Sequence, residues 1–232
     1  MLALTLINLC SREYQDVAFA RIAKAPSGNN ANWLDWLNDA QRAVVAVRPD
    51  ANSITQSVLL IAGTRQTLPS SAQRLLDVTR NTGVAGVTPG RTVRLSERRQ
   101  EDEVNRDWHT AATGTVVKDV YYDEKKDPTV FWVRPGIPAS PAVYLEIIYS
   151  KAPTDVTDAD AGSITLLDTY APAMQAWMLA RAFGMATQAQ NQFQRSQYYM
   201  AMFMQLLGVK LRADVMAGIL QPPTYPTGAA AK

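Results

Sequence analysis

The chain has 232 residues, of which 47% are apolar and 19% are charged, and its formal net charge is +2. This composition is typical of a globular protein and excludes a disordered chain. Acidic and basic residues are mixed along the whole sequence, so no segment forms the basic block of a dedicated nucleic-acid-binding domain. Cys10 is the only cysteine, which excludes an internal disulfide and a cysteine-rich metal site and suits folding in a reducing cytoplasm.

The first predicted element is a helix over residues 4–15. The opening sequence, MLALTLINLC, is apolar but has no basic stretch and no small-residue cleavage site, which argues against a signal peptide. A lipoprotein signal ending at Cys10 is the alternative. Residues 17–22 favour a short extended piece, and no apolar run reaches the roughly 18–20 residues that span a bilayer. Four side chains are expected to face inward from this helix: Leu2, Leu6, Leu9 and Cys10.

A longer amphipathic helix is predicted over residues 30–48, and we expect it to organise the core. Asn29 or Asn30 can cap its start, and Pro49 prevents its continuation. The helical periodicity places two tryptophans on its buried side, where they are typical packing residues. The complete apolar stripe is Trp33, Trp36, Leu37, Ala40, Val44 and Val47.

From residue 52 the pattern changes to short stretches rich in β-branched residues, separated by turn sequences. Ala62-Gly63-Thr64 is typical of a hairpin turn between the first two stretches. The charged sequence SERRQEDEV, residues 96–104, predicts one small solvated helix, with a salt-bridged subunit contact as the alternative. Strands are expected over residues 53–61, 65–68, 74–79, 92–95, 115–122, 129–134 and 142–149.

Two further helices are predicted towards the C-terminus. Between residues 169 and 186 the only charge is Arg181, and a helix this apolar on all sides must be buried by its own chain or by neighbours. A second helix, over residues 190–207, is expected to end at Gly208, a favourable residue just after a helix. Its apolar stripe would contain Phe193, Met200, Phe203, Met204 and Leu207.

The order of these elements predicts an α+β protein: a four-helix bundle with an inserted, mainly antiparallel β domain and a C-terminal arm. The expected helical bundle comprises residues 1–50 and 165–208, the inserted β domain residues 51–150, the linker residues 151–164, and the docking arm residues 209–232. Because the arm combines apolar residues with a proline-rich end, we expect it to become ordered only on a partner.

The sequence offers no convincing motif for catalysis or cofactor binding. His109 is the only histidine, so any histidine-based catalytic or metal site would rest on that one residue. The loop of residues 86–92, GVTPGRT, is similar to a phosphate-binding loop, but its glycine spacing is one residue short and arginine replaces the lysine. We therefore expect no catalytic residue, no cofactor and no metal.

Two acidic groups offer alternatives, a calcium loop and an acid–base pair. Residues 155–162 carry three aspartates, but the glycine is misplaced and no glutamate closes the loop, so a solvated linker is favoured. Glu97, Glu101 and Glu103 could pair as acid and base, yet nothing apolar surrounds them to raise a pKa. A hydrolase built on aspartate and glutamate alone would need such a pair in a cleft.

Six blocks of sequence, taken together and in this order, resemble a family of bacteriophage head-to-tail adaptors of short-tailed phages. The ordered set is more specific than any single block. The blocks span about residues 30 to 155 and read WLDWLNDAQRAVVAVRPDA, AGTRQTLP, RLLDVTRN, TPGRTVRL, NRDWHTA and EIIYSKAP.

The resemblance implies a structural, non-enzymatic virion protein, synthesised in the bacterial host cytoplasm, with no membrane contact. It implies a ring of twelve copies between the portal protein and the tail (nozzle) protein, through which DNA passes without sequence-specific binding. The lack of a basic block suits such a channel, because phosphate-binding side chains would hold the DNA. Subunit contacts are expected at Arg195, Tyr198 and Met202. Portal contacts are expected in the arm at Leu211, Val215, Met216, Ile219, Leu220 and Tyr225.

A nucleic-acid-binding β domain is the principal alternative function. The segment between residues 51 and 150 contains several basic residues that could follow a phosphate backbone, but nearly as many acidic residues lie in the same segment. The basic residues in question are Arg91, Arg94, Arg98, Arg99, Lys118, Lys125 and Lys126.

Overall fold

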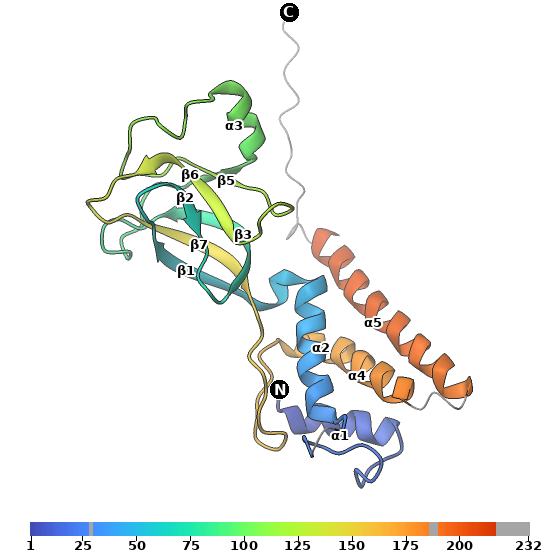
Figure 1. Ribbon diagram of the computed structural model, residues 1–232. Helices are drawn as coiled ribbons and strands as arrows, with labels where there is room; N and C mark the ends of the chain where they lie inside the picture. The colour runs from blue at the N-terminus through green and yellow to red at the C-terminus, as the bar shows by residue number, and fades with distance from the viewer. Residues whose placement is uncertain (28–29, 186–189, 217–232) are drawn as a thin grey trace, which may run out of the picture. The chain divides into compact units, whose positions relative to one another are not determined.

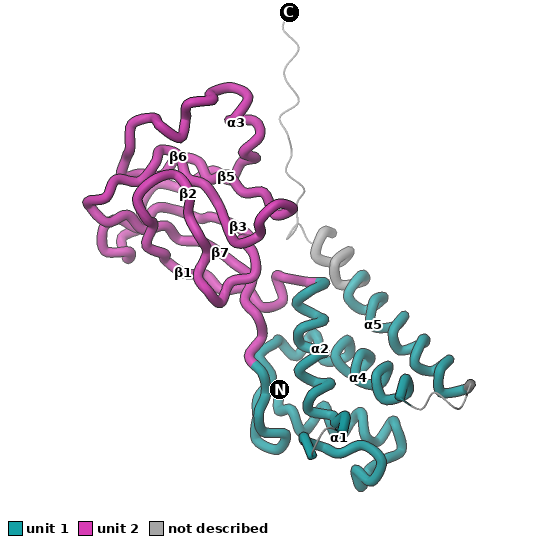
Figure 2. The backbone as a smooth tube through the Cα atoms, in the orientation of Figure 1, with its two compact units in different colours: residues 1–47, 155–232 teal, residues 48–154 magenta. Residues whose placement is uncertain are grey.

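The chain divides into two compact units, which Figure 2 shows in teal and magenta. The computed structural model describes residues 1–27, 30–185 and 190–216. Unit 1 contains residues 1–47 and 155–232, and unit 2 contains residues 48–154. Unit 2 therefore interrupts unit 1 in the sequence, and each unit is built around its own core.

Unit 1 is helical (Figure 1). The helices lie within a few residues of their predicted positions, except at the end of the last helix. Gly208 was expected to terminate this helix, but it has no positive φ and the helix continues through it. The helical elements are α1 (Ala3–Glu13), α2 (Trp33–Val47), the 3-10 turn η2 (Asp168–Tyr170), α4 (Ala171–Met185) and α5 (Gln190–Met216).

Helix α4 is the helix on which the other three pack. It lies against α1, α2 and α5, and α1 and α2 also touch each other. This explains why its sequence is apolar on all sides: a helix surrounded by three others has no wide solvent face. The buried residues of α4 are Ala173, Met174, Ala176, Met178, Leu179, Ala180, Ala182 and Phe183.

The prediction of a four-helix bundle with an inserted β domain is wrong. The described residues form five α-helices and seven strands in two sheets, a mixed α+β structure. A closed bundle requires each helix to turn an apolar stripe towards a common axis. Helix α5 instead runs along α4, and the large apolar side chains that it buries are Phe203 and Leu207. Helical periodicity identified the helices but did not specify which of them would be central.

Helix α2 begins one residue after its cap, Asn32, whose side-chain oxygen accepts a hydrogen bond from the backbone N–H of Asp35 at 2.9 Å. Asn32 therefore takes the role predicted for Asn29 or Asn30. The predicted apolar stripe is buried except for Val47, which is 45% exposed. Trp33 and Trp36 pack edge to face with their ring centroids 5.3 Å apart, so the two tryptophans belong to the core of unit 1.

Two buried amides on α2 hold the segment that follows unit 2. Asn38 donates to the Val156 carbonyl at 3.0 Å and accepts from the Val156 N–H at 2.8 Å. Gln41 accepts a hydrogen bond from the N–H of Thr165 at 3.1 Å. These amides satisfy backbone groups of an irregular segment beside the helix, which would otherwise be buried without partners. Much of this segment therefore packs against α2.

Helix α1 differs from its prediction in which side chains face inward. Leu6 and Cys10 are buried, but Leu2 and Leu9 are exposed, and Ala3 and Ile7 take the remaining buried positions. The Cys10 sulfur lies 3.9 Å from the sulfur of Met178, and burial, with a smaller contribution from Glu13, raises the pKa of the thiol. This cysteine is a packing residue of the helical core.

The expected extended piece at residues 17–22 is instead a series of turns around Asp16. The carboxylate of Asp16 accepts hydrogen bonds from the backbone N–H groups of Ala20, Arg21 and Ile22. Burial opposes ionisation of Asp16, but these three donors outweigh it and lower its pKa. Phe19 adopts a φ of 55°, a left-handed conformation that an extended piece would not contain.

Unit 2 is a β structure with one short helix. Its strands form two sheets, in the orders β1-β7-β3 and β2-β6-β5-β4, and all pairs are antiparallel except β4–β5. The elements are the 3-10 turn η1 (Pro49–Asn52), β1 (Ser53–Leu59), β2 (Gly63–Thr67), β3 (Ala72–Asn81), β4 (Arg94–Ser96), α3 (Arg98–Val104), β5 (Asp119–Tyr122), β6 (Val130–Ile137) and β7 (Tyr144–Lys151).

The hairpin predicted at Ala62-Gly63-Thr64 is wrong, because β1 and β2 belong to different sheets. The side chain of Gln66 provides the physical reason. Its amide accepts from the N–H of Ile61 and donates to the Ile61 carbonyl, both at 2.8 Å. The buried amide thus supplies the hydrogen bonds that a hairpin ladder would have made, and the chain crosses from one sheet to the other.

The core of unit 2 contains apolar side chains from both sheets. On β7, the alternate residues Leu145, Ile147 and Tyr149 are buried, as the period of two in a strand requires. On β6, Phe131 and Val133 are fully buried.

Replacing Trp33 with alanine tests the core of unit 1. Trp33 is fully buried and contacts Trp36 and Tyr14, so Trp33→Ala should lower the free energy of unfolding by about 3–5 kcal/mol. Urea denaturation followed by tryptophan fluorescence and circular dichroism would measure the change. The matched control is Val47→Ala on the same helix, which should change the stability by less than about 0.5 kcal/mol. If Trp33→Ala and Val47→Ala were equally stable, Trp33 would not be a core residue.

Candidate subunit-contact site

The α4–α5 pair carries the candidate site. The two helices approach closely at Gly184, where an added Cβ would lie 3.2 Å from the hydroxyl oxygen of Ser196. That hydroxyl donates to the Ala180 carbonyl at 2.8 Å. Phe183 stacks on Tyr199 with ring centroids 5.5 Å apart, so an aromatic contact fixes the pair beside the small residues.

Helix α5 buries much less of its apolar surface than its sequence predicts. Of the expected stripe, Phe203 and Leu207 are buried, whereas Phe193 and Met204 are 54% and 58% exposed and Met200 is also exposed. A helix of 27 residues covered along one side leaves its flanks free within a single chain. Clusters of exposed large apolar side chains on such a helix are typical of protein–protein contacts.

The structure places the three predicted subunit-contact residues on this helix. The guanidinium of Arg195 lies 5.6 Å above the ring of Phe183, and Tyr198 is 64% exposed and meets Tyr199 edge to face. Met202 is half-buried and lines a hollow together with Tyr198. Tyr198 is more exposed than Met202, and part of Arg195 packs against α4.

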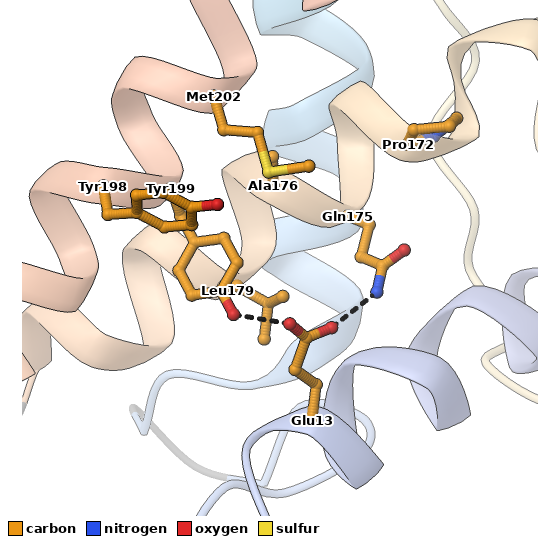
Figure 3. Close-up of a pocket in the computed structure, with 8 residues that line it drawn as sticks. All are labelled: Glu13, Pro172, Gln175, Ala176, Leu179, Tyr198, Tyr199 and Met202. Atoms are coloured by element: carbon orange, nitrogen blue, oxygen red, sulfur yellow. Dashed lines mark hydrogen bonds between the residues drawn. The ribbon is translucent and has the colours of Figure 1, made fainter.

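The hollow has a volume of about 200 Å³ and lies where α1, α4 and α5 meet. Figure 3 shows that its walls combine apolar and polar side chains and that one carboxylate, from Glu13, points into it from α1. The lining residues are Glu13, Pro172, Gln175, Ala176, Leu179, Tyr198, Tyr199 and Met202. Glu13 and Gln175, which sequence periodicity did not single out, are brought together only by the packing of three helices.

The Glu13 carboxylate joins the three helices through hydrogen bonds. The hydroxyl of Tyr199 donates to one carboxylate oxygen, and the amide of Gln175 donates to the other at 2.9 Å (Figure 3). Burial, and then the hydrogen bond to Glu13, raise the pKa of Tyr199 to about 12. Tyr199 is thus a neutral donor at ordinary pH. No ion pair to Glu13 is formed by the residues that the structure describes.

The basic residues proposed for nucleic-acid binding are largely neutralised by acidic neighbours. Four of the seven form ion pairs: Arg94 with Asp119, Arg98 with Asp102, Arg99 with Glu103 and Lys126 with Asp123. Arg91, Arg94 and Lys118 line a hollow of about 400 Å³ that also contains Asp119. These paired charges weaken the continuous positive track that a phosphate backbone requires.

The other sequence candidates have structural roles. His109 stacks on Trp108, and its Nδ1 lies 2.8 Å from the hydroxyl of Thr64. Asp158 accepts hydrogen bonds from the backbone of residues 160 and 161, and its neighbours Asp155 and Asp160 form ion pairs with Arg42 and Lys24, respectively.

The glutamates of residues 97–104 do not form an acid–base pair. Glu101 forms an ion pair with Arg134, and Glu103 forms one with Arg99. Within residues 1–27, 30–185 and 190–216, no cluster of three or more histidine, cysteine, aspartate or glutamate residues is arranged to hold a metal. In the same ranges, no helix has the length and apolar character needed to cross a membrane.

Three of the six predicted portal-binding residues lie beyond the described part of the chain. The backbone of residues 211–216 continues α5, which places Leu211, Val215 and Met216 on that helix, but their side chains are outside the described residues. Ile219, Leu220 and Tyr225 also lie outside the described residues.

Comparison with known proteins supports the resemblance found in the sequence. A family model described as SU10 adaptor protein matches residues 1–223, nearly the whole chain. A comparison with curated proteins gave no match. The chain belongs to the SU10 adaptor protein family, a family of phage head-to-tail adaptors, and this membership gives it a structural adaptor role in the virion.

Proposed function

We propose that copies of this chain form a closed ring of twelve between the portal and the tail (nozzle) protein of a phage, extending the DNA channel. The protein acts by assembly and not by catalysis, and it is synthesised in the host cytoplasm before joining the virion. Family membership supports the adaptor role. The proposal goes beyond family membership in three respects: the ring, its copy number and its two partners.

The observation that carries the ring proposal is the uncovered surface of α5. In a ring of identical copies, each copy meets its two neighbours through two different surfaces. Helix α5 offers two such surfaces, because Tyr198 and Met202 lie roughly 160° around the helix axis from Met200 and Met204. Both pairs leave apolar side chains at least partly uncovered within one chain. Arg195, Tyr198 and Met202 are accordingly assigned to one of the two contacts.

Replacing Tyr198 tests this contact. Tyr198→Ala should leave the melting temperature of a single chain within about 2 °C, since an exposed side chain contributes little to folding. It should raise the concentration at which rings are half formed by about tenfold or more, because interface tyrosines are often hot spots. Analytical ultracentrifugation would measure assembly. Arg12→Ala, an exposed position on α1 outside the hollow, is the control and should assemble like wild type.

We also propose that residues 209–232 act as the docking arm for the portal. The sequence supports this role through apolar residues and a proline-rich end. The first residues of the arm continue α5, so a contact made by the arm would be linked rigidly to the helix that joins the subunits. Ring formation and portal docking would then use adjacent parts of one element.

A truncation that keeps α5 intact separates docking from folding. Deleting residues 217–232 should leave the melting temperature unchanged and should abolish co-sedimentation with the portal protein. The control replaces the same residues with a glycine–serine segment of equal length, which should also fail to bind. Retention of portal binding by either variant would exclude residues 217–232 from docking.

DNA should pass through the ring without being held. Most basic side chains of unit 2 that could contact phosphates are paired with acidic residues, and a channel for sliding DNA gains nothing from tight phosphate contacts.

Fluorescence anisotropy with a short duplex checks this expectation. Between about 50 and 200 mM salt, we expect no binding stronger than the roughly 10⁻⁴–10⁻⁶ M of non-specific DNA binders. Tight binding that falls steeply with salt, and is lost in an Arg91→Ala/Lys118→Ala variant, would favour the nucleic-acid-binding alternative.

A further inference from the structure

The two sides of the α4–α5 pair differ in charge. One side, the pocket face, contains Gln175 and Leu179 of α4 and Tyr198 and Met202 of α5, together with Glu13 of α1. Residues two positions apart on a helix point roughly 200° away from each other. Trp177 and Arg181 of α4, and Met200 and Met204 of α5, therefore lie on the opposite side, which we call the arginine face.

Glu13 is a carboxylate that the described part of the chain leaves without a cation. It accepts hydrogen bonds from Tyr199 and Gln175 but forms no ion pair among the described residues. Arg195 lies on the same face but is positioned over the ring of Phe183. Two neutral donors orient the carboxylate in a hollow that is also lined by the apolar side chains of Leu179 and Met202, which suits a partner group with an apolar stem and a cationic end.

Arg181 is such a group on the opposite face. It is exposed, its guanidinium lies 5.2 Å from the centre of the Trp177 ring, and it forms no ion pair with the residues that the structure describes. Arg181 is also the only charged residue in α4. Met200 and Met204 of α5 add exposed apolar side chains to the same face.

We propose that the hollow over Glu13 receives Arg181 from the next copy of this chain. The proposal rests on the ring proposed above and names the pair of faces that closes it. The pocket face of one copy would meet the arginine face of the next, with apolar surface around a carboxylate–guanidinium pair. Each copy carries one of each face, on opposite sides of the same helix pair, as a head-to-tail contact requires.

Charge exchange between two variants tests the pair. Glu13→Arg and Arg181→Glu each place like charges at every contact, so each should assemble at least about tenfold more weakly than wild type. An equal mixture of the two should restore rings, since copies that alternate around the ring bring opposite charges together at every contact. Analytical ultracentrifugation and electron microscopy would follow assembly, with circular dichroism to check that each variant is folded.

Controls separate this inference from the ring itself. Arg12→Glu makes a charge reversal of the same size on α1 outside the hollow and should assemble normally. If Arg12→Glu weakened assembly as much as Glu13→Arg, the effect would be one of net charge, and the proposal would be overturned. If Glu13→Arg does not fold, Glu13→Gln replaces it in the mixture, because removing the carboxylate also relieves its repulsion from the glutamate that Arg181→Glu introduces.

The remaining outcomes are distinct. Rings that form equally well from each single variant, or variants that stay apart when mixed, would overturn the Glu13–Arg181 contact while leaving the ring in place. Wild-type protein that forms no ring, with or without the portal protein, would overturn the proposed function itself.

Discussion

The helical unit depends on the burial of α4 by three other helices. An apolar helix with a single exposed charge can be accommodated only where neighbours cover most of its surface. Helices α1 and α2 cover one part of it, and α5 covers another. Because α4 lies in the middle, α5 packs along one side of it, and among the described residues several apolar side chains of α5 stay exposed. The surface proposed for assembly therefore follows from how the core is arranged.

The sequence predicted the helices and strands well but not their arrangement. Periodicity and turn residues placed most elements within a few residues of their positions, since these signals are local. Two errors arose where a polar side chain takes over backbone hydrogen bonds a few residues away, which apolar periodicity does not detect. Gln66 replaces the expected hairpin by a crossing between sheets, and Asp16 accepts hydrogen bonds from three N–H groups of an expected extended piece. The four-helix bundle failed for a different reason, because periodicity does not identify the central helix.

The candidate site shows the same division between local and non-local information. The exposed position of Tyr198 could be anticipated in part from the helical pattern of α5, whereas Met204, which was expected on the buried stripe, is exposed. The hollow over Glu13 could not, since Glu13 and Tyr199 are 186 positions apart and meet only after three helices have packed. The lone charge of α4, Arg181, was visible in the sequence, but its position opposite the carboxylate emerges only from the structure. In unit 2, three of the four ion pairs join residues only three or four positions apart, so their spacing was visible in the sequence, whereas the pair of Arg94 with Asp119 required the folded sheet.

The central claim is that this chain functions as a closed ring, and its mass tests that claim most directly. Native mass spectrometry of the full-length protein, alone and with purified portal protein, would give the number of copies in each species. We expect one discrete assembly of twelve copies, free or bound to the portal, and no open-ended series of larger assemblies. A protein that stays monomeric in both conditions, or that forms an open-ended series of sizes, would contradict the account.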